Sequence, residues 1–434
     1  MKSPVSTVLR GKTQERIAVR FLSGRLGLGF DWYGIKYYEK AIQTLVKSIT
    51  PKDPQTSHTP GTDHSSPAVL LSGGDLMVRA EGEDPIARLL GTCILIQYEH
   101  LSANRDAWSG HLTGFSKLLD LIGNGMLLSR CPLFEQVYPW TKDIMEVKAG
   151  FWNFVVNDLE ESRQFTPKQH NNTQNLPLWR NMGLLIEDDG QLSLASCSNN
   201  LSTTAEHARN KVLSFTLIWL LCKVIDHLAP LPQSDHSRAE TESSAARDFV
   251  HLESQFDKWH QIISASFHPD GTFFTPVNGD QEPKGLFARE IWFSNDFCST
   301  TMMYYHMARL LLLIHRPPGL LSEMFQNNVS ASFDLIHTLR ETKQKLQFHA
   351  AEVISIARGT PCDAVKLRAI QPLYIAGRCC TTVEDRKGLV EFLASIQDNL
   401  GIATGYRIKA LLEEWGVTYG DFGMEERLTA EAQL

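Results

Sequence analysis

Long apolar runs are missing from this chain of 434 residues. A membrane span needs about 18–20 consecutive apolar residues, and no segment approaches that length. The best candidate, residues 212–225, is interrupted by Ser214 and Lys223. We therefore expect this segment to form a core helix, and we predict no membrane association for the chain.

Signatures of catalysis are also missing. The sequence contains no G-x-S-x-G, no H-E-x-x-H and no G-x-x-x-x-G-K-[ST] pattern. Gly27 and Gly29 are followed by Asp31 rather than by a third glycine, which argues against a dinucleotide site. His306 and His315 lie near opposite faces of one expected helix and cannot share a metal ion. We predict no catalytic, cofactor-binding, metal-binding or DNA-binding residue, and no enzyme activity.

Paired cysteines of the metal-binding kind are absent as well. None of the eight cysteines forms a C-x-x-C pair, and two of them are adjacent. Most lie in apolar helical contexts, where a free thiol behaves as a small hydrophobic side chain. We expect them to be reduced and buried, without zinc. They are Cys93, Cys131, Cys197, Cys222, Cys298, Cys362, Cys379 and Cys380.

The chain as a whole carries more negative than positive charge, and its start is the opposite. The formal net charge is −7, which argues against nucleic-acid binding over the whole surface. Residues 1–25 are the exception, because they hold six basic side chains and only one acidic one, Glu15. This segment is either a basic linker or an ordinary solvated start. The basic residues are Lys2, Arg10, Lys12, Arg16, Arg20 and Arg25.

Helical periodicity is what the sequence does contain. Apolar residues recur at the spacing of one helix face in nearly every segment, and no run of strands is indicated. We predict an all-α, multi-helix fold with helix-bundle-like packing and about ten or more helices. The expected helices cover residues 31–49, 85–101, 107–122, 147–159, 203–228, 245–263, 333–355 and 405–415, with an apolar stripe at 389–400 ended by Gly401.

One further helix is marked at both ends. Ser294 or Asn295 can cap its N-terminus, and the two prolines at 317 and 318 cannot continue it. Its apolar stripe is wide enough to be mostly buried. The stripe comprises Met303, Met307, Leu310, Leu311 and Ile314.

Four polar or turn-rich segments separate the helices. Residues 50–75 read as a flexible linker, and residues 165–177, 230–244 and 268–285 read as loops. Within the last loop we expect Phe273 and Phe274 to pack onto the core.

Tryptophans at helical spacing are expected in the core, Trp152, Trp259 and Trp292 in particular. The alternative is that some of them line a small-molecule pocket between helices. The other tryptophans in this pattern are Trp108, Trp179, Trp219 and Trp415.

Several blocks, in one order, carry a family resemblance. They are residues 86–121 with the H-L-x-G-x-x-x-L-L pattern, 149–165 with F-W-x-x-x-x-x-D, 257–269, 291–318 with IWF and YYHMARLLLLIHRP, 372–380, and 412–416. In the third block Ser264 stands where the pattern commonly has proline. Together these blocks resemble the helical regulatory region of fungal-specific transcription factors. Members of that family normally carry a Zn₂Cys₆ DNA-binding cluster ahead of this region.

The resemblance implies a domain organisation. Residues 1–29 would be a basic N-terminal segment and 30–416 the helical regulatory domain, with a flexible loop at about 50–80. Residues 417–434 would be an acidic C-terminal tail. The zinc cluster is not present, because the first cysteine is Cys93, inside an expected helix. Two explanations stay open: a gene model that lacks its first exon, or a protein that works without the cluster.

The function implied is that of a nuclear transcription regulator of metabolic or secondary-metabolite genes. It would act through coregulators or a DNA-binding partner, as a homo- or heterodimer, or in response to a small-molecule effector. No sequence-specific DNA contact by this chain alone is predicted. The alternatives are an α-helical enzyme or ligand-binding protein with a pocket among the helices, and a purely structural scaffold.

Overall fold

The computed structural model describes residues 85–102, 105–125, 142–161, 172–188, 190–192, 203–229, 238–274, 285–317 and 335–423. These residues form eleven α-helices, two short 3-10 helices and one two-stranded sheet, so the predicted all-α fold is confirmed. The predicted helix at 31–49, the basic segment 1–29 and the loop at 50–80 lie outside the described residues, as do residues 424–434 of the tail. The described residues fall into two compact units, divided within helix α5 between Asn157 and Asp158.

The N-terminal unit contains most of α3 (Pro85–Ser102), all of α4 (Arg105–Gly125) and most of α5 (Lys142–Glu161). Its core includes the stacked rings of Phe115 and Phe154, whose centroids lie 4.4 Å apart. Trp152 is only 5% exposed, which confirms its predicted place in the core. All three helices were predicted, and each extends beyond the predicted range at one or both ends.

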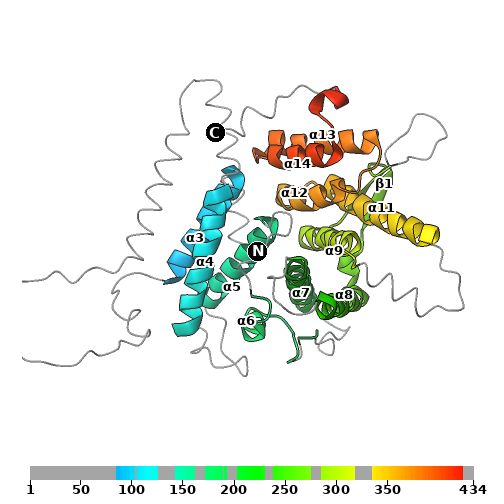
Figure 1. Cartoon of the computed structure of the whole chain (residues 1–434). Coiled ribbons are helices and arrows are strands. Elements are labelled where there is room, and N and C mark those ends of the chain that lie inside the picture. The colour runs from blue at the N-terminus through cyan, green and yellow to red at the C-terminus, as the bar shows by residue number, and fades with distance from the viewer. Residues whose placement is uncertain are drawn as a thin grey trace, which may run out of the picture. The chain divides into compact units, whose positions relative to one another are not determined.

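The C-terminal unit contains the remaining helices (Figure 1). Helix α9 (Asp296–Ile314) packs against three others, α7, α11 and α12, and is thereby at the centre of this unit. The others are α6 (Leu176–Asn181), α7 (Thr203–Leu228), α8 (Arg238–Gln261), α11 (Leu335–Gly359), α12 (Asp363–Gly377), α13 (Val383–Leu400) and α14 (Gly405–Trp415).

The ends of α9 follow from its sequence. Asn295 is the cap, because its side-chain oxygen accepts hydrogen bonds from the main-chain N–H groups of Phe297 and Cys298. The predicted apolar stripe is buried except for Ile314, which is half-buried at the last turn.

The bounds of α7 and α14 match the predicted ranges, and α14 ends where Gly416 adopts a left-handed φ of 65°.

The predicted loop at 268–285 was wrong in part. Strand β1 (Gly271–Phe274) pairs antiparallel with β2 (Arg289–Trp292), and Gly271 faces Trp292 in the register. Because side chains alternate along a strand, Ile291 is buried while Trp292 is 39% exposed. Phe273 and Phe274 are 62% and 66% exposed. The expectation that these three aromatic residues lie in the core was therefore wrong.

Two other predicted loops are shorter than expected. Helix α6 already begins at Leu176, with the side chain of Asn175 accepting a hydrogen bond from the N–H of Leu178. Helix α8 begins at Arg238, seven residues before the predicted 245. Its polar first turns lack the apolar spacing from which the prediction was made, which explains the late start.

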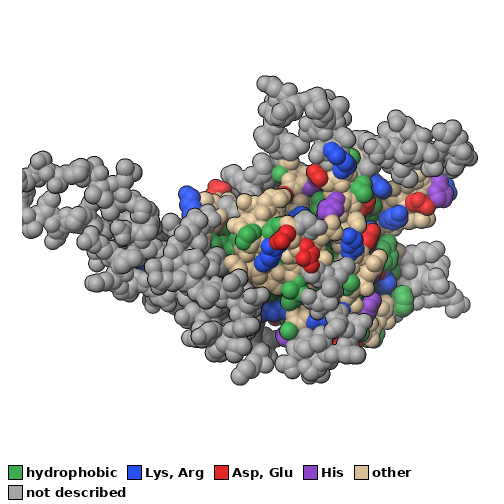
Figure 2. Space-filling view, turned by 90° about the horizontal axis from the view of Figure 1, so that it is seen from below, with side chains coloured by type: hydrophobic (Ala, Val, Ile, Leu, Met, Phe, Trp, Pro, Cys, Tyr) green, Lys and Arg blue, Asp and Glu red, His purple; other side chains and the backbone are tan. Residues whose placement is uncertain are grey.

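Charged side chains of both signs are interspersed on the face shown in Figure 2. Among the described residues, no helix is long and apolar enough to cross a membrane.

A pocket between helices α9, α12 and α14 as the candidate functional site

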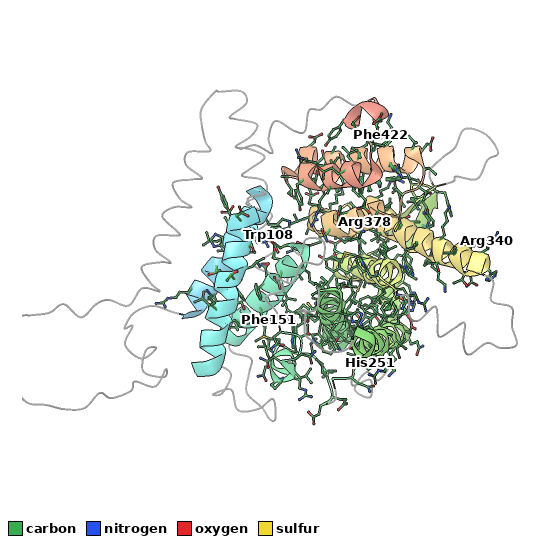
Figure 3. All side chains as sticks on the ribbon, viewed as in Figure 1. Trp108, Phe151, His251, Arg340, Arg378 and Phe422 are labelled. Carbon is green, nitrogen blue, oxygen red and sulfur yellow. The ribbon has the colours of Figure 1, made fainter. Side chains whose placement is uncertain are left out.

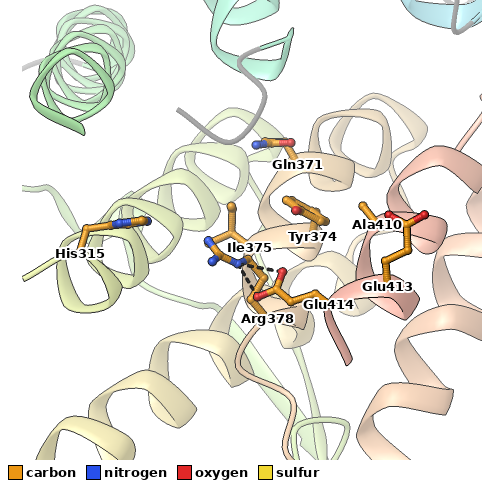
Figure 4. A pocket seen from close by; sticks show the side chains of 8 residues that line it. All are labelled: His315, Gln371, Tyr374, Ile375, Arg378, Ala410, Glu413 and Glu414. Atoms are coloured by element: carbon orange, nitrogen blue, oxygen red, sulfur yellow. Dashed lines mark hydrogen bonds and ion pairs between the residues drawn. The ribbon is translucent and has the colours of Figure 1, made fainter. Parts of the chain in front are cut away.

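A pocket of about 380 Å³ lies in the C-terminal unit (Figure 4). Its walls come from the C-terminal end of α9, from α12 and from α14. Arg378, one of its lining residues, is the C-cap of α12 and is labelled in Figure 3.

Helix α12 supplies half of the lining. Gln371, Tyr374, Ile375 and Arg378 are spaced i, i+3, i+4 and i+7, so they lie along one face of the helix. The residue after Gln371 is Pro372, which sits inside the helix and has no N–H to donate. One face of α12 therefore supplies both apolar and polar side chains to the pocket.

Helix α14 forms the opposite wall. Ala410, Glu413 and Glu414 are spaced i, i+3 and i+4 and so share a face of this helix. The guanidinium Nε of Arg378 donates to both carboxylate oxygens of Glu414, at 2.9 and 3.1 Å. This ion pair joins α12 to α14 at the edge of the pocket.

His315 completes the lining from the C-cap of α9. Partial burial lowers the pKa of its imidazole, and the positive charge of Arg378 lowers it further. The imidazole is therefore neutral at physiological pH. The lining consequently carries one positive charge, on Arg378, and two negative charges, on Glu413 and Glu414.

The side chain of Gln371 is 9% exposed, and its Oε1 has no hydrogen-bond partner among the described residues. Leaving a buried acceptor unsatisfied costs about 1–3 kcal/mol. This amide oxygen is therefore a site at which a donor from outside the described residues would be stabilised.

A buried polar network adjoins the pocket through Tyr374. The guanidinium of Arg407 lies 4.7 Å from the centroid of that ring and donates to the main-chain oxygen of Glu160 at 3.1 Å. The Glu160 carboxylate accepts from Arg368 at 2.7 Å and from the hydroxyl of Tyr304 at 2.8 Å. Burial, chiefly, raises the pKa of Tyr304 well above its usual range, so this hydroxyl remains a donor.

Histidines gather elsewhere, where α9 packs on α11. The Nδ1 atoms of His306 and His349 lie 2.9 Å apart, so one ring donates and the other accepts. Burial lowers the pKa of both, that of His349 to about 4. The sequence places His306 and His315 near opposite faces of one helix, and the partner of His306 is instead His349 of α11. His349 was not predicted, because partners from different helices leave no spacing signal.

No group of three or more His, Cys, Asp or Glu side chains within the described part of the chain has a geometry that could hold a metal ion. All six described cysteines are free. Five are buried, as predicted, whereas Cys362 is only half-buried. Cys131 and Cys197 lie outside the described residues.

The tryptophans are mostly core residues. Trp108, Trp179, Trp219 and Trp259 are at most 2% exposed, and the indole N–H of Trp259 donates to the main-chain oxygen of Leu213. None of the tryptophans that the structure describes lines the pocket, whose aromatic wall is Tyr374. A pocket between helices is present, but it is formed by other residues than the tryptophans considered for it.

Comparison with known proteins identifies the family. A match to the fungal specific transcription factor domain covers residues 34–415. The chain belongs to this family. The fungal specific transcription factor domain therefore spans both compact units and includes every residue of the pocket.

A relative of known function is the transcription activator AMTR1 of Alternaria alternata. It is 26% identical over 346 residues, which are 75% of this chain and 44% of that relative. The chain thus spans less than half the length of that protein. No solved structure matches the chain.

Proposed function

We propose that the chain is a nuclear transcription regulator that controls metabolic or secondary-metabolite genes through its helical regulatory domain. The observation that carries this proposal is the family match over residues 34–415. The likeness to a transcription activator over 75% of the chain supports it independently.

We further propose that these 434 residues act on transcription without reading DNA sequence or holding zinc themselves. Sequence-specific readout in this family's usual way needs a zinc-held helix in the major groove. The sequence contains no cysteine pattern for such a module. Coregulators, a DNA-binding partner or a second copy would supply the contact with the promoter.

The described thiols offer no activated cysteine nucleophile. Burial raises the pKa of Cys93 and of Cys298 to about 12, and that of Cys379 to about 11. These side chains are therefore protonated thiols, which are poor nucleophiles. Enzyme activity is accordingly not part of the proposed function.

A tethering experiment tests the proposal. The whole chain is fused to a heterologous DNA-binding domain, and transcription of a reporter with the matching binding site is measured. We expect a several-fold change in reporter transcription, with the unfused chain as the control. An inert fusion that is nuclear and folded would contradict the proposal.

A further inference from the structure

We propose that the pocket between α9, α12 and α14 binds a small organic amine, a cation with a compact aromatic or apolar body. This inference rests on the proposed function, for which it supplies the effector. The amine would meet the exposed carboxylate of Glu413, with its body against Tyr374, Ile375 and Ala410. It would reach the amide oxygen of Gln371, which is closed to solvent, once the side chains over that oxygen move aside.

The size of the pocket sets the kind of ligand. A volume of about 380 Å³ falls within the range of about 300–1,000 Å³ typical of small-molecule sites. The space suits a metabolite-sized molecule and not a folded partner. Its walls come from three helix segments, so a bound ligand would link the end of α9 to α12 and α14.

Gln371 indicates that the ligand carries a hydrogen-bond donor. Its Oε1 is buried and lacks a partner among the described residues, although buried acceptors are nearly always paired. The oxygen can only accept, so the complementary group is an N–H or an O–H. An ammonium group fulfils this requirement with three donors.

The charge of the lining favours a cation over an anion. Arg378 is already paired with Glu414, whereas Glu413 has no ion-pair partner in the described part of the chain. The neutral His315 adds no positive charge. The remaining charge is therefore the single negative charge of Glu413, which attracts an ammonium group and repels a carboxylate.

The middle of the pocket is less polar. The Tyr374 ring, Ile375 and Ala410 lie between the polar groups in Figure 4. A ring or short alkyl body packed there would bury apolar surface. The guanidinium of Arg407 lies 4.7 Å from the centroid of the Tyr374 ring and packs against it from within the protein.

Two probes that differ mainly in charge test the inference. Tryptamine presents an ammonium group on an indole, whereas indole-3-acetate presents a carboxylate on the same ring. Each is titrated calorimetrically into the purified chain of 434 residues. We expect saturable, one-to-one binding of tryptamine, and binding of indole-3-acetate that is weaker by about tenfold or more.

Variants locate the site. Gln371→Leu should raise the melting temperature of the free chain, because it removes an unsatisfied buried acceptor, and weaken tryptamine binding by about two- to tenfold. Glu413→Gln, at an exposed position, should weaken tryptamine binding without affecting folding. Glu391→Gln is the matched control, since Glu391 is exposed on α13 and does not line the pocket.

The inference would be overturned if both probes bound equally, if tryptamine did not bind, or if Gln371→Leu and Glu413→Gln both left its affinity unchanged. The titration needs no DNA and no cell. A failure to bind amines therefore leaves the reporter result of the tethered chain standing, and an inert reporter leaves the binding result standing.

Discussion

Trp259 is a core residue whose replacement should clearly lower the free energy of unfolding. It is fully buried, it donates a hydrogen bond to Leu213, and its ring packs against Phe267 and Tyr305. Trp259→Ala should lower the free energy of unfolding by about 3–5 kcal/mol, because it opens a large cavity. Denaturant unfolding followed by circular dichroism measures this change.

Trp292 provides the matched control, because it is 39% exposed on the hairpin. Trp292→Ala should cost less than about 1 kcal/mol, as is usual for surface positions. If the two variants unfolded at the same denaturant concentration, the placement of these two rings would be contradicted.

The pair of His306 and His349 makes stability depend on pH. The unfolded imidazole binds a proton near pH 6.5, whereas His349 in the folded protein does so only near pH 4. The unfolded state therefore binds more protons in this window, and the free energy of unfolding falls as the pH drops from about 6.5 to 4. We expect a loss of about 2–3 kcal/mol from this group, measured by denaturant unfolding across that range.

His349→Gln should flatten this pH dependence while lowering stability at pH 7 through loss of the hydrogen bond to His306. His337→Gln is the control, since His337 is exposed on the same helix. A pH profile of His349→Gln as steep as that of the unsubstituted chain would show that His349 does not titrate as proposed.

At the scale of the elements, the backbone of α11 packs directly on that of β2 at Gly359. A Cβ on Gly359, the last residue of α11, would meet the main-chain oxygen of Ile291. Backbone cannot move aside as a flexible side chain can. Gly359→Ala should therefore destabilise the protein by about 1–3 kcal/mol or more, as overpacking does.

The same substitution at Gly110 in α4, where no atom lies within 4 Å, should stabilise the protein by about 0.5–1 kcal/mol. Thermal or denaturant unfolding of both variants decides between these outcomes, and equal effects would contradict the packing of α11 on β2.

Elements with a long apolar face and a marked end were predictable. The cap at Asn295, the left-handed Gly416 and the stripe of α9 are local signals, and each element they define is present. The hairpin was not predictable in the same way, because four-residue strands show too little alternation to be recognised. Trp292 was placed in the core on helical spacing, although β2 is a strand and turns every second side chain outward. Phe273 and Phe274 were expected to pack onto the core, although β1 has no buried residue and both of these neighbours are exposed.

The pocket was not predicted, because none of the expected helices covers residues 363–377, which supply much of its lining. The spacing of Gln371, Tyr374 and Arg378 on one helix face is visible in the sequence. The facing carboxylates of α14 and the histidine from α9 join them through packing between distant segments, for which a single sequence gives no signal. The same holds for Glu160, which meets Arg368 and Tyr304 across 208 and 144 residues of chain.

At the scale of the whole molecule, we expect no DNA sequence preference from the isolated chain. The basic residues between Lys2 and Arg25 can make only a few phosphate contacts on a chain of net charge −7. They should give salt-sensitive attraction with dissociation constants of about 10⁻⁴–10⁻⁶ M. A binding-site selection with the purified chain measures this, and enrichment of a motif would contradict it.

We also expect metal removal to leave the fold intact. A chelator should not change the far-ultraviolet circular dichroism or the melting temperature, because we propose that no structural zinc supports these helices. Metal analysis of the purified chain provides the control. Two zinc ions per chain, or unfolding by the chelator, would contradict this proposal.

The central claim is that the chain acts on genes from within the nucleus. Chromatin occupancy of the tagged chain, expressed from its own locus, tests it most directly. We predict a defined set of occupied promoters, whose genes change in transcript level when the chain is deleted. Uniform background occupancy, with the tagged chain outside the nucleus, would contradict the account.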